Sequence, residues 1–259
     1  MRVKNLLVST LKKPLNKVRG IVVSYSPYMI SSVIAPPRNF PYMLVTSANA
    51  IKKRVPIKKR KDVPNRYIMK GIDWDELTID VCDSTMHPTI CDIFVEGKHF
   101  TETKQYHTMI AAVDSFADGN IEDPGRHGGY WCKSREDVEK YFEILLDCYN
   151  SIKHDGYKTQ EQIYRETGAV GSGYLVRSLK DEITVFIDNN GDLVFTGKGA
   201  NHRFSIVQLL DIKHLPVRLI GIDERYVKKM FNNYFFMDLE EISRNIILSH
   251  NGLEFMVSE

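Results

Sequence analysis

The sequence predicts an α+β protein, in which a core of strands and helices carries a helical insertion, a basic N-terminal arm and C-terminal helices. A β-hairpin pattern over 183–196 and two amphipathic helix patterns, over 134–156 and from about 202 to 210, predict this class. The chain has 259 residues, of which 43% are hydrophobic and 26% charged, so it can bury the core of a globular protein.

The N-terminal segment differs from the rest of the chain in charge. Residues 1–61 contain 14 Lys and Arg residues and no Asp or Glu, whereas the remainder carries 21 basic and 33 acidic residues, a net charge of −12. Six prolines in the segment disfavour long helices, so it should be irregular or form short strands. We therefore expect a basic arm over 1–61, a core domain over 62–225 and a C-terminal helical extension over 226–259.

The positive charge is densest at the end of the expected arm, and such a cluster attracts phosphate-rich surfaces, either nucleic acid or anionic membrane lipid. The alternative is that the arm lies against the acidic body of its own chain. The cluster consists of Lys52, Lys53, Arg54, Lys58, Lys59, Arg60 and Lys61.

The cysteine spacing and hydropathy indicate a cellular location. The four cysteines include no C-x-x-C pair, as is usual for reduced thiols in a cytosolic protein. The apolar run over 21–35 is too short and too interrupted to span a bilayer. We expect a cytoplasmic protein, with a peripheral position at the membrane as a second option because of the basic cluster.

Helix signals flank the hairpin. Ser134 is a good N-cap with Asp137 three residues later, apolar residues then recur at three- and four-residue spacing, and Gly156 is placed to end the helix. Towards the C-terminus, helices are expected over about 224–237 and 239–249.

The hairpin leads into a loop that suits an anion. Its strands, 183–187 and 193–196, are joined by Asn190-Gly191, a pair that accepts the positive φ of a tight turn. A glycine-bearing loop, a helix and a further strand over 215–220 follow. Glycines let backbone amides approach phosphate, and the helix N-terminus adds positive partial charge. The expected nucleotide-binding residues are Lys198, Gly199, Ala200, Asn201, His202, Arg203 and Ser205.

Each polar group of the loop has an expected task. Arg203 is a bidentate phosphate ligand, and His202 is a proton donor or acceptor near neutral pH. Asp181 and Glu182 precede the hairpin, and Glu182 is the expected catalytic base or metal partner. The alternative is structural: His202 as a surface residue that opens the helix, and Arg203 in an ion pair with Asp181 or Glu182.

The hairpin, loop, helix and strand resemble the core of the ParB/sulfiredoxin-like superfamily, whose G-x-[HR]-R motif matches Ala200-Asn201-His202-Arg203 and whose I-P-V strand matches Leu215-Pro216-Val217. The resemblance covers about 136–220 and includes a helix ending in S-I-x-x-x-G. Chromosome-partition CTPases, sulfiredoxins and free serine kinases belong to this superfamily. The chain is similar in particular to archaeal and bacterial ParB-like proteins without an assigned activity, through short elements around Trp74, Phe100, Trp131 and Gly156.

Two departures from the family pattern narrow what the resemblance implies. Asn201 stands where sulfiredoxins carry cysteine, so repair of sulfinic acid is not implied. No helix-turn-helix domain follows, so centromere binding is not implied either. The resemblance implies an ATP- or CTP-dependent phosphotransferase, kinase or NTPase with Mg²⁺, acting on a small-molecule, glycan or protein acceptor through His202, Arg203 and Glu182. The alternative is a nucleic-acid-binding regulatory module that uses the basic arm.

Overall fold

The computed structural model confirms the α+β class. Its strands form one mixed sheet in the order β4-β2-β6-β5-β7-β1-β8, and β3 pairs with β7 beside this path. The strands are β1 (Tyr42–Thr46), β2 (Ile51–Arg54), β3 (Ile68–Met69), β4 (Ile79–Asp80), β5 (Thr184–Ile187), β6 (Leu193–Phe195), β7 (Leu215–Asp223) and β8 (Glu254–Phe255). The structure describes residues 42–63, 66–83, 86–168, 181–197, 199–231 and 239–255.

Helices cover and extend this sheet. The α-helices are α3 (Trp74–Leu77), α4 (Met86–Phe94), α5 (Lys104–Ala117), α6 (Arg135–Asp155), α7 (Gln160–Thr167), α8 (Asn201–Leu209), α9 (Glu224–Met230) and α10 (Leu239–Ser249). Short 3-10 turns are η1 (Ala48–Ala50), η2 (Ile57–Asp62), η3 (Val81–Asp83), η4 (Phe100–Glu102) and η5 (Pro124–His127). No helix in the described ranges is both long enough and apolar enough to cross a bilayer.

The hairpin and the helix that follows it lie where the sequence predicts them. β5 and β6 pair antiparallel, and Gly191 in the turn has φ 96°. The Asp188 carboxylate accepts the amides of Asn190 and Asp192 at 2.8 and 2.9 Å, which fixes the turn. After α8 the chain enters β7, which runs parallel to β5. The strand–turn–strand–loop–helix–strand order is therefore confirmed.

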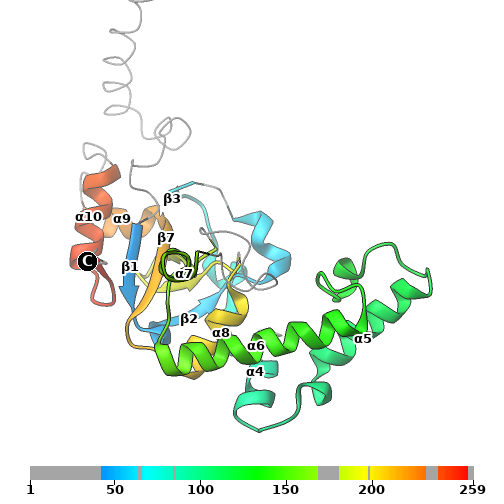
Figure 1. The fold of residues 1–259 in the computed structure, drawn as a ribbon. Helices are drawn as coiled ribbons and strands as arrows, with labels where there is room; N and C mark the ends of the chain where they lie inside the picture. Colours follow the sequence, from blue (N-terminus) through cyan, green and yellow to red (C-terminus); the bar gives the residue numbers. More distant parts are fainter. Residues whose placement is uncertain are drawn as a thin grey trace, which may run out of the picture.

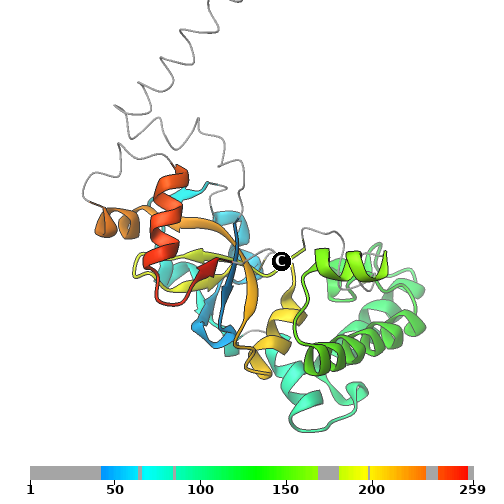
Figure 2. The same ribbon diagram turned by 60° about the vertical axis from the view of Figure 1, so that its left-hand side comes forward.

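α6 forms with the predicted ends. The Ser134 hydroxyl accepts the amide of Asp137, the Asp137 carboxylate accepts the amide of Ser134, and Gly156 ends the helix with φ 78°. Figures 1 and 2 show α5 and α6 projecting from the α8 side of the sheet, while α9 and α10 lie at the opposite end. These helices, α5 and α6, form the helical insertion. They extend away from the sheet, and α6 packs against α8.

The expected arm, 1–61, lies only partly within the described residues. Its described part, from Tyr42 onward, supplies two strands of the sheet: β1 pairs antiparallel with β7, and β2 pairs parallel with β6. At the other end of the chain, α10 leads to β8, which pairs with β1. Strands from both ends of the chain therefore take part in the sheet, and the division into domains stays a prediction.

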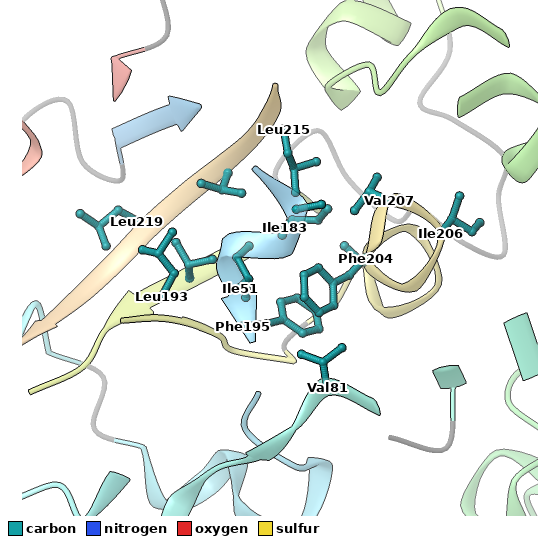
Figure 3. Packing of buried hydrophobic residues seen from close by; sticks show 14 of the residues in the cluster. Ile51, Val81, Ile183, Leu193, Phe195, Phe204, Ile206, Val207, Leu215 and Leu219 are labelled. Atoms are coloured by element: carbon teal, nitrogen blue, oxygen red, sulfur yellow. The ribbon is translucent and has the colours of Figure 1, made fainter. Parts of the chain in front are cut away.

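The core fixes the start of α8 against the end of β6. Phe195 and Phe204 are fully buried and stack with their ring centroids 4.1 Å apart. Figure 3 shows these two rings side by side, with Val207 of α8 directed towards Ile183 and Leu215 of the sheet. These side chains leave α8 little freedom, so the start of the helix has a defined position against β6.

Candidate functional site: an anion site at the start of α8

The loop before α8 has a backbone that suits an anion, and with Arg54 and Arg60 it is called the candidate anion site. Gly197 and Gly199 have φ of 68° and 88°, and Ala200, the residue before the helix, has φ 50°. No side chain caps the helix, and the amides of Asn201, His202 and Arg203 have no acceptor among the described residues. Three donors at the positive end of a helix therefore stay open for a ligand. Lys198 lies outside the described residues.

Asn201 joins the loop to two arginines that are distant in sequence. Its side-chain oxygen accepts hydrogen bonds from Nη2 of Arg54 at 2.7 Å and from Nη2 of Arg60 at 3.2 Å. Its side-chain nitrogen, Nδ2, donates to the Gly197 carbonyl at 3.2 Å. A Cβ on Gly197 would lie 2.9 Å from the Arg60 guanidinium. The glycine therefore gives Arg60 access to the loop.

Both arginines have unused hydrogen-bonding capacity. Arg54 is only 3% exposed, and neither it nor Arg60 pairs with a carboxylate among the described residues. Nε and Nη1 of Arg54 and Nε of Arg60 are buried without a hydrogen-bond partner there. Burial and the nearby charge of Arg54 lower the pKa of Arg60 to about 10. Two uncompensated cations side by side are unfavourable unless an anion joins them.

Arg203 has a different environment. Its guanidinium lies 3.6 Å from the Asp181 carboxylate and 3.7 Å from that of Glu182, and it donates to the Tyr157 hydroxyl at 3.1 Å and to the Asp181 carbonyl. The side chain is 5% exposed. The ion-pair alternative for Arg203 is therefore confirmed, and its charge is compensated inside the protein.

Glu182 is equally engaged. One carboxylate oxygen accepts the Tyr157 hydroxyl at 2.9 Å and the other accepts the amide of Gln160 at the start of α7. Burial raises the pKa of Glu182, against these hydrogen bonds and Arg203. The residue fits an anchor for α7 better than a metal ligand. Within the described ranges no three His, Cys, Asp or Glu residues are grouped to hold a metal ion, so the role of Glu182 with Mg²⁺ stays a prediction.

His202 is held by the helical insertion. Gln105 of α5 donates to the Tyr141 hydroxyl at 3.0 Å, and that hydroxyl also hydrogen-bonds Nε2 of His202, with the direction set by the tautomer of the ring. Nδ1 of His202 has no partner among the described residues. Burial, followed by the charge of Arg203, lowers the pKa of His202 to about 3. The ring is therefore neutral near pH 7, and the expected role of His202 in proton transfer stays a prediction.

The two remaining predicted site residues, Ala200 and Ser205, are buried beside the first turn of α8. Ala200 is buried, and Ser205 is 1% exposed and donates its hydroxyl to the Asn201 carbonyl at 3.1 Å. Ser205 therefore supports the first turn of α8 from inside. Its expected contact with a nucleotide stays a prediction.

The basic cluster is divided by the fold. Lys53 and Lys59 each lie 3.8 Å from an acid of α3, Asp75 and Glu76 respectively. Arg54 and Arg60 face Asn201, as described above. The lysines that are exposed and lack an acidic partner in the described part of the chain are Lys52, Lys58 and Lys61.

A pocket of about 260 Å³ lies beside η2 and α3. Its one cation, Lys59, pairs with Glu76, while Asp73 accepts the amide of Glu76 at 3.0 Å and Asp62 is exposed. The described lining of the pocket therefore offers no unpaired positive charge like that of Arg54 and Arg60.

Compared with models of protein families, with curated proteins and with solved structures, the chain matches none of them. The site is thus defined by its own geometry. Sequence reasoning found the loop but not Arg54, Arg60, Tyr141 or Gln105 as its neighbours. One signal pointed to the two arginines: they lie in the only long stretch of the chain that lacks acids.

Proposed function

We propose that the protein is a nucleotide-binding phosphotransferase or NTPase of the ParB/sulfiredoxin-like type, in which Arg54 and Arg60 hold the phosphates. The observation that carries the proposal is that the buried guanidinium of Arg54 and the half-buried one of Arg60 meet at Asn201 without a carboxylate among the described residues. Guanidinium forks suit phosphate oxygens, and a helix N-terminus beside them adds further donors.

The described side chains divide the work. Arg54 and Arg60 neutralise phosphate charge, the amides of Asn201 to Arg203 donate to its oxygens, and His202, in the tautomer with its proton on Nδ1, supplies a neutral donor. Arg203, with its two acidic partners, holds the loop in place rather than contacting the ligand. A phosphoryl group in transfer needs charge stabilisation of this kind at fixed positions.

The transfer step itself is supported by the family resemblance. ATP or CTP is the expected donor, and Mg²⁺ would arrive bound to its phosphates, because the described residues offer no three-ligand group of their own. The acceptor, whether a small molecule, a glycan or a protein, is to be found by assaying turnover.

Calorimetric titration with ATP, CTP and GTP, with and without Mg²⁺, tests the proposal. We expect binding of at least one nucleotide, weakened about 30-fold or more in Arg60→Gln, since a buried charge pair contributes about 2–5 kcal/mol. The matched control is Arg165→Gln, because Arg165 is an exposed arginine of α7 paired with Glu161. Absence of binding by the folded wild-type protein would refute the nucleotide proposal.

A second candidate, a nucleic-acid-binding module, is favoured by one observation: Lys52, Lys58 and Lys61 are exposed and lack acidic partners within the described residues. Binding of this kind weakens steeply with salt, with a slope near −0.9 per phosphate contact on duplex DNA. A DNA or RNA titration at two salt concentrations therefore distinguishes it from nucleotide binding in the α8 loop.

A further inference from the structure

The segment that joins α5 to α6 presents one tyrosine in a fixed and unusual conformation. Tyr130 has φ 54°, a region that bulky residues rarely adopt. Its neighbours fix it: the amide of Gly129 donates to the Pro124 carbonyl at 2.8 Å, and the amide of Cys132 donates to the Gly129 carbonyl at 3.1 Å. A Cβ on Gly125 would lie 2.5 Å from the Tyr130 carbonyl oxygen, so the turn closes only with glycine there. Backbone strain that is held so firmly favours a functional role.

Tyr130 is brought to the edge of the anion site. Its ring stacks on Tyr141 with centroids 5.4 Å apart and lies 6.3 Å from the His202 ring. Its phenol is close enough to Arg60 for each group to influence the pKa of the other. An aromatic surface from the helical insertion therefore lies beside both the histidine and one of the two arginines.

The next residue adds an exposed aromatic surface. Trp131 is 56% exposed, which is unusual for the largest apolar side chain, whereas the other tryptophan, Trp74, is 2% exposed and donates to Asp223 at 2.7 Å. An exposed indole therefore follows, by one residue, the tyrosine ring that lies beside His202 and Arg60.

We propose that Tyr130 and Trp131 form the wall on which the base of the bound nucleotide stacks, so that the ligand is a nucleoside di- or triphosphate rather than a free phosphate compound. This inference rests on the proposed function, because it assigns the base to a site whose phosphate half is Arg54 and Arg60. A planar heterocycle gains from stacking on a rigid aromatic side chain, and the stacking tolerates different bases.

Tryptophan fluorescence provides the first test. Titration with ATP and CTP is expected to quench the emission of Trp131, and inorganic tripolyphosphate is expected to bind without this quenching. Trp131→Phe should remove the nucleotide-dependent change, because the remaining Trp74 is buried in the core. Equal quenching in wild type and Trp131→Phe would overturn the placement of the base at Trp131.

Substitution at Tyr130 provides the second test. Tyr130→Phe keeps the aromatic plane and should retain nucleotide affinity, whereas Tyr130→Leu should weaken ATP or CTP binding about tenfold. Tripolyphosphate affinity should be the same in both variants and in wild type. If Tyr130→Leu weakens both ligands equally, or neither, the base wall is refuted while the phosphate site stands. If wild type binds neither ATP, CTP nor tripolyphosphate, the proposed function fails and the base wall fails with it.

Discussion

Replacing Arg54 with methionine should make the free protein more stable and the anion site weaker. The arginine is 3% exposed, and two of its guanidinium nitrogens have no partner in the described part of the chain. Each buried, unsatisfied polar group costs about 1–3 kcal/mol. The arginine's favourable contacts are one hydrogen bond to Asn201, worth about 1.5 kcal/mol, and the Phe195 ring at 5.4 Å, worth about 0.5–1 kcal/mol.

The two unsatisfied nitrogens together cost about 2–6 kcal/mol and the two contacts return about 2–2.5 kcal/mol, so Arg54→Met should raise the free energy of unfolding by up to about 4 kcal/mol, since methionine fills a similar volume without a charge. In a protein of this size, such a gain raises Tm by about 2–4 °C per kcal/mol. Ligand affinity should change in the opposite direction to stability. Without the Arg54 guanidinium, tripolyphosphate or nucleotide should bind about 30-fold more weakly or worse.

Urea unfolding in the absence and presence of tripolyphosphate measures both effects. A ligand at 100 times its Kd stabilises the folded state by about 2.7 kcal/mol, and this increment should nearly disappear in Arg54→Met. Arg135→Met is the control, because Arg135 is exposed and paired with Asp114. A variant that is less stable than wild type without ligand, yet gains the same increment from tripolyphosphate, would refute the reasoning.

Three further predictions concern the surroundings of the site. Arg203→Met should destabilise the fold by about 3–5 kcal/mol in urea unfolding, because the buried Glu182 and the partly buried Asp181 lose their cation; a change below about 1 kcal/mol would contradict the internal role of Arg203. His202 has a lowered folded-state pKa of about 3, so its stabilisation is complete above pH 6.5 and decreases as the pH falls towards 3. His202→Gln should reduce that slope by up to about 1.4 kcal/mol per pH unit, and an identical pH dependence in both proteins would argue against burial of the ring. Combined substitution of Lys52, Lys58 and Lys61 by Gln should leave nucleotide affinity within about twofold; a larger loss, measured by calorimetry, would place these lysines in the site.

Much of the unit around α8 follows from local signals in the sequence. Asn190-Gly191 marks the hairpin turn, and Ser134 with Asp137 marks the start of α6. These patterns act over a few residues, because a turn or a cap is determined by its own backbone and its nearest side chains. The start of α10 at Leu239 and its end at Ser249 also agree with the sequence pattern.

The remainder of the site depends on contacts between distant segments. The bond between Arg54 and Asn201 spans 147 residues, and the bond between Tyr141 and His202 spans 61. No periodicity or capping rule encodes such pairings, which arise when β2 pairs with β6 and α6 packs on α8. The prolines of residues 1–61 argue against long helices and leave irregular chain or short strands open, and from Tyr42 onward pairing with β7 and β6 produces strands.

Charge balance explains why Arg54 and Arg60, and not the motif arginine Arg203, are proposed to hold the phosphates. The motif arginine, Arg203, lies between Asp181 and Glu182, so its charge is already used within the protein. An anion at the α8 N-terminus therefore needs cations from elsewhere, and Arg54 and Arg60 come from a stretch of sequence that has no acids to neutralise them. Deletion of residues 1–61 does not test the basic arm alone, because it also removes β1 and β2 from the sheet and both arginines from the site. Single charge substitutions are the sharper probe, since each removes one cation and leaves every strand in place.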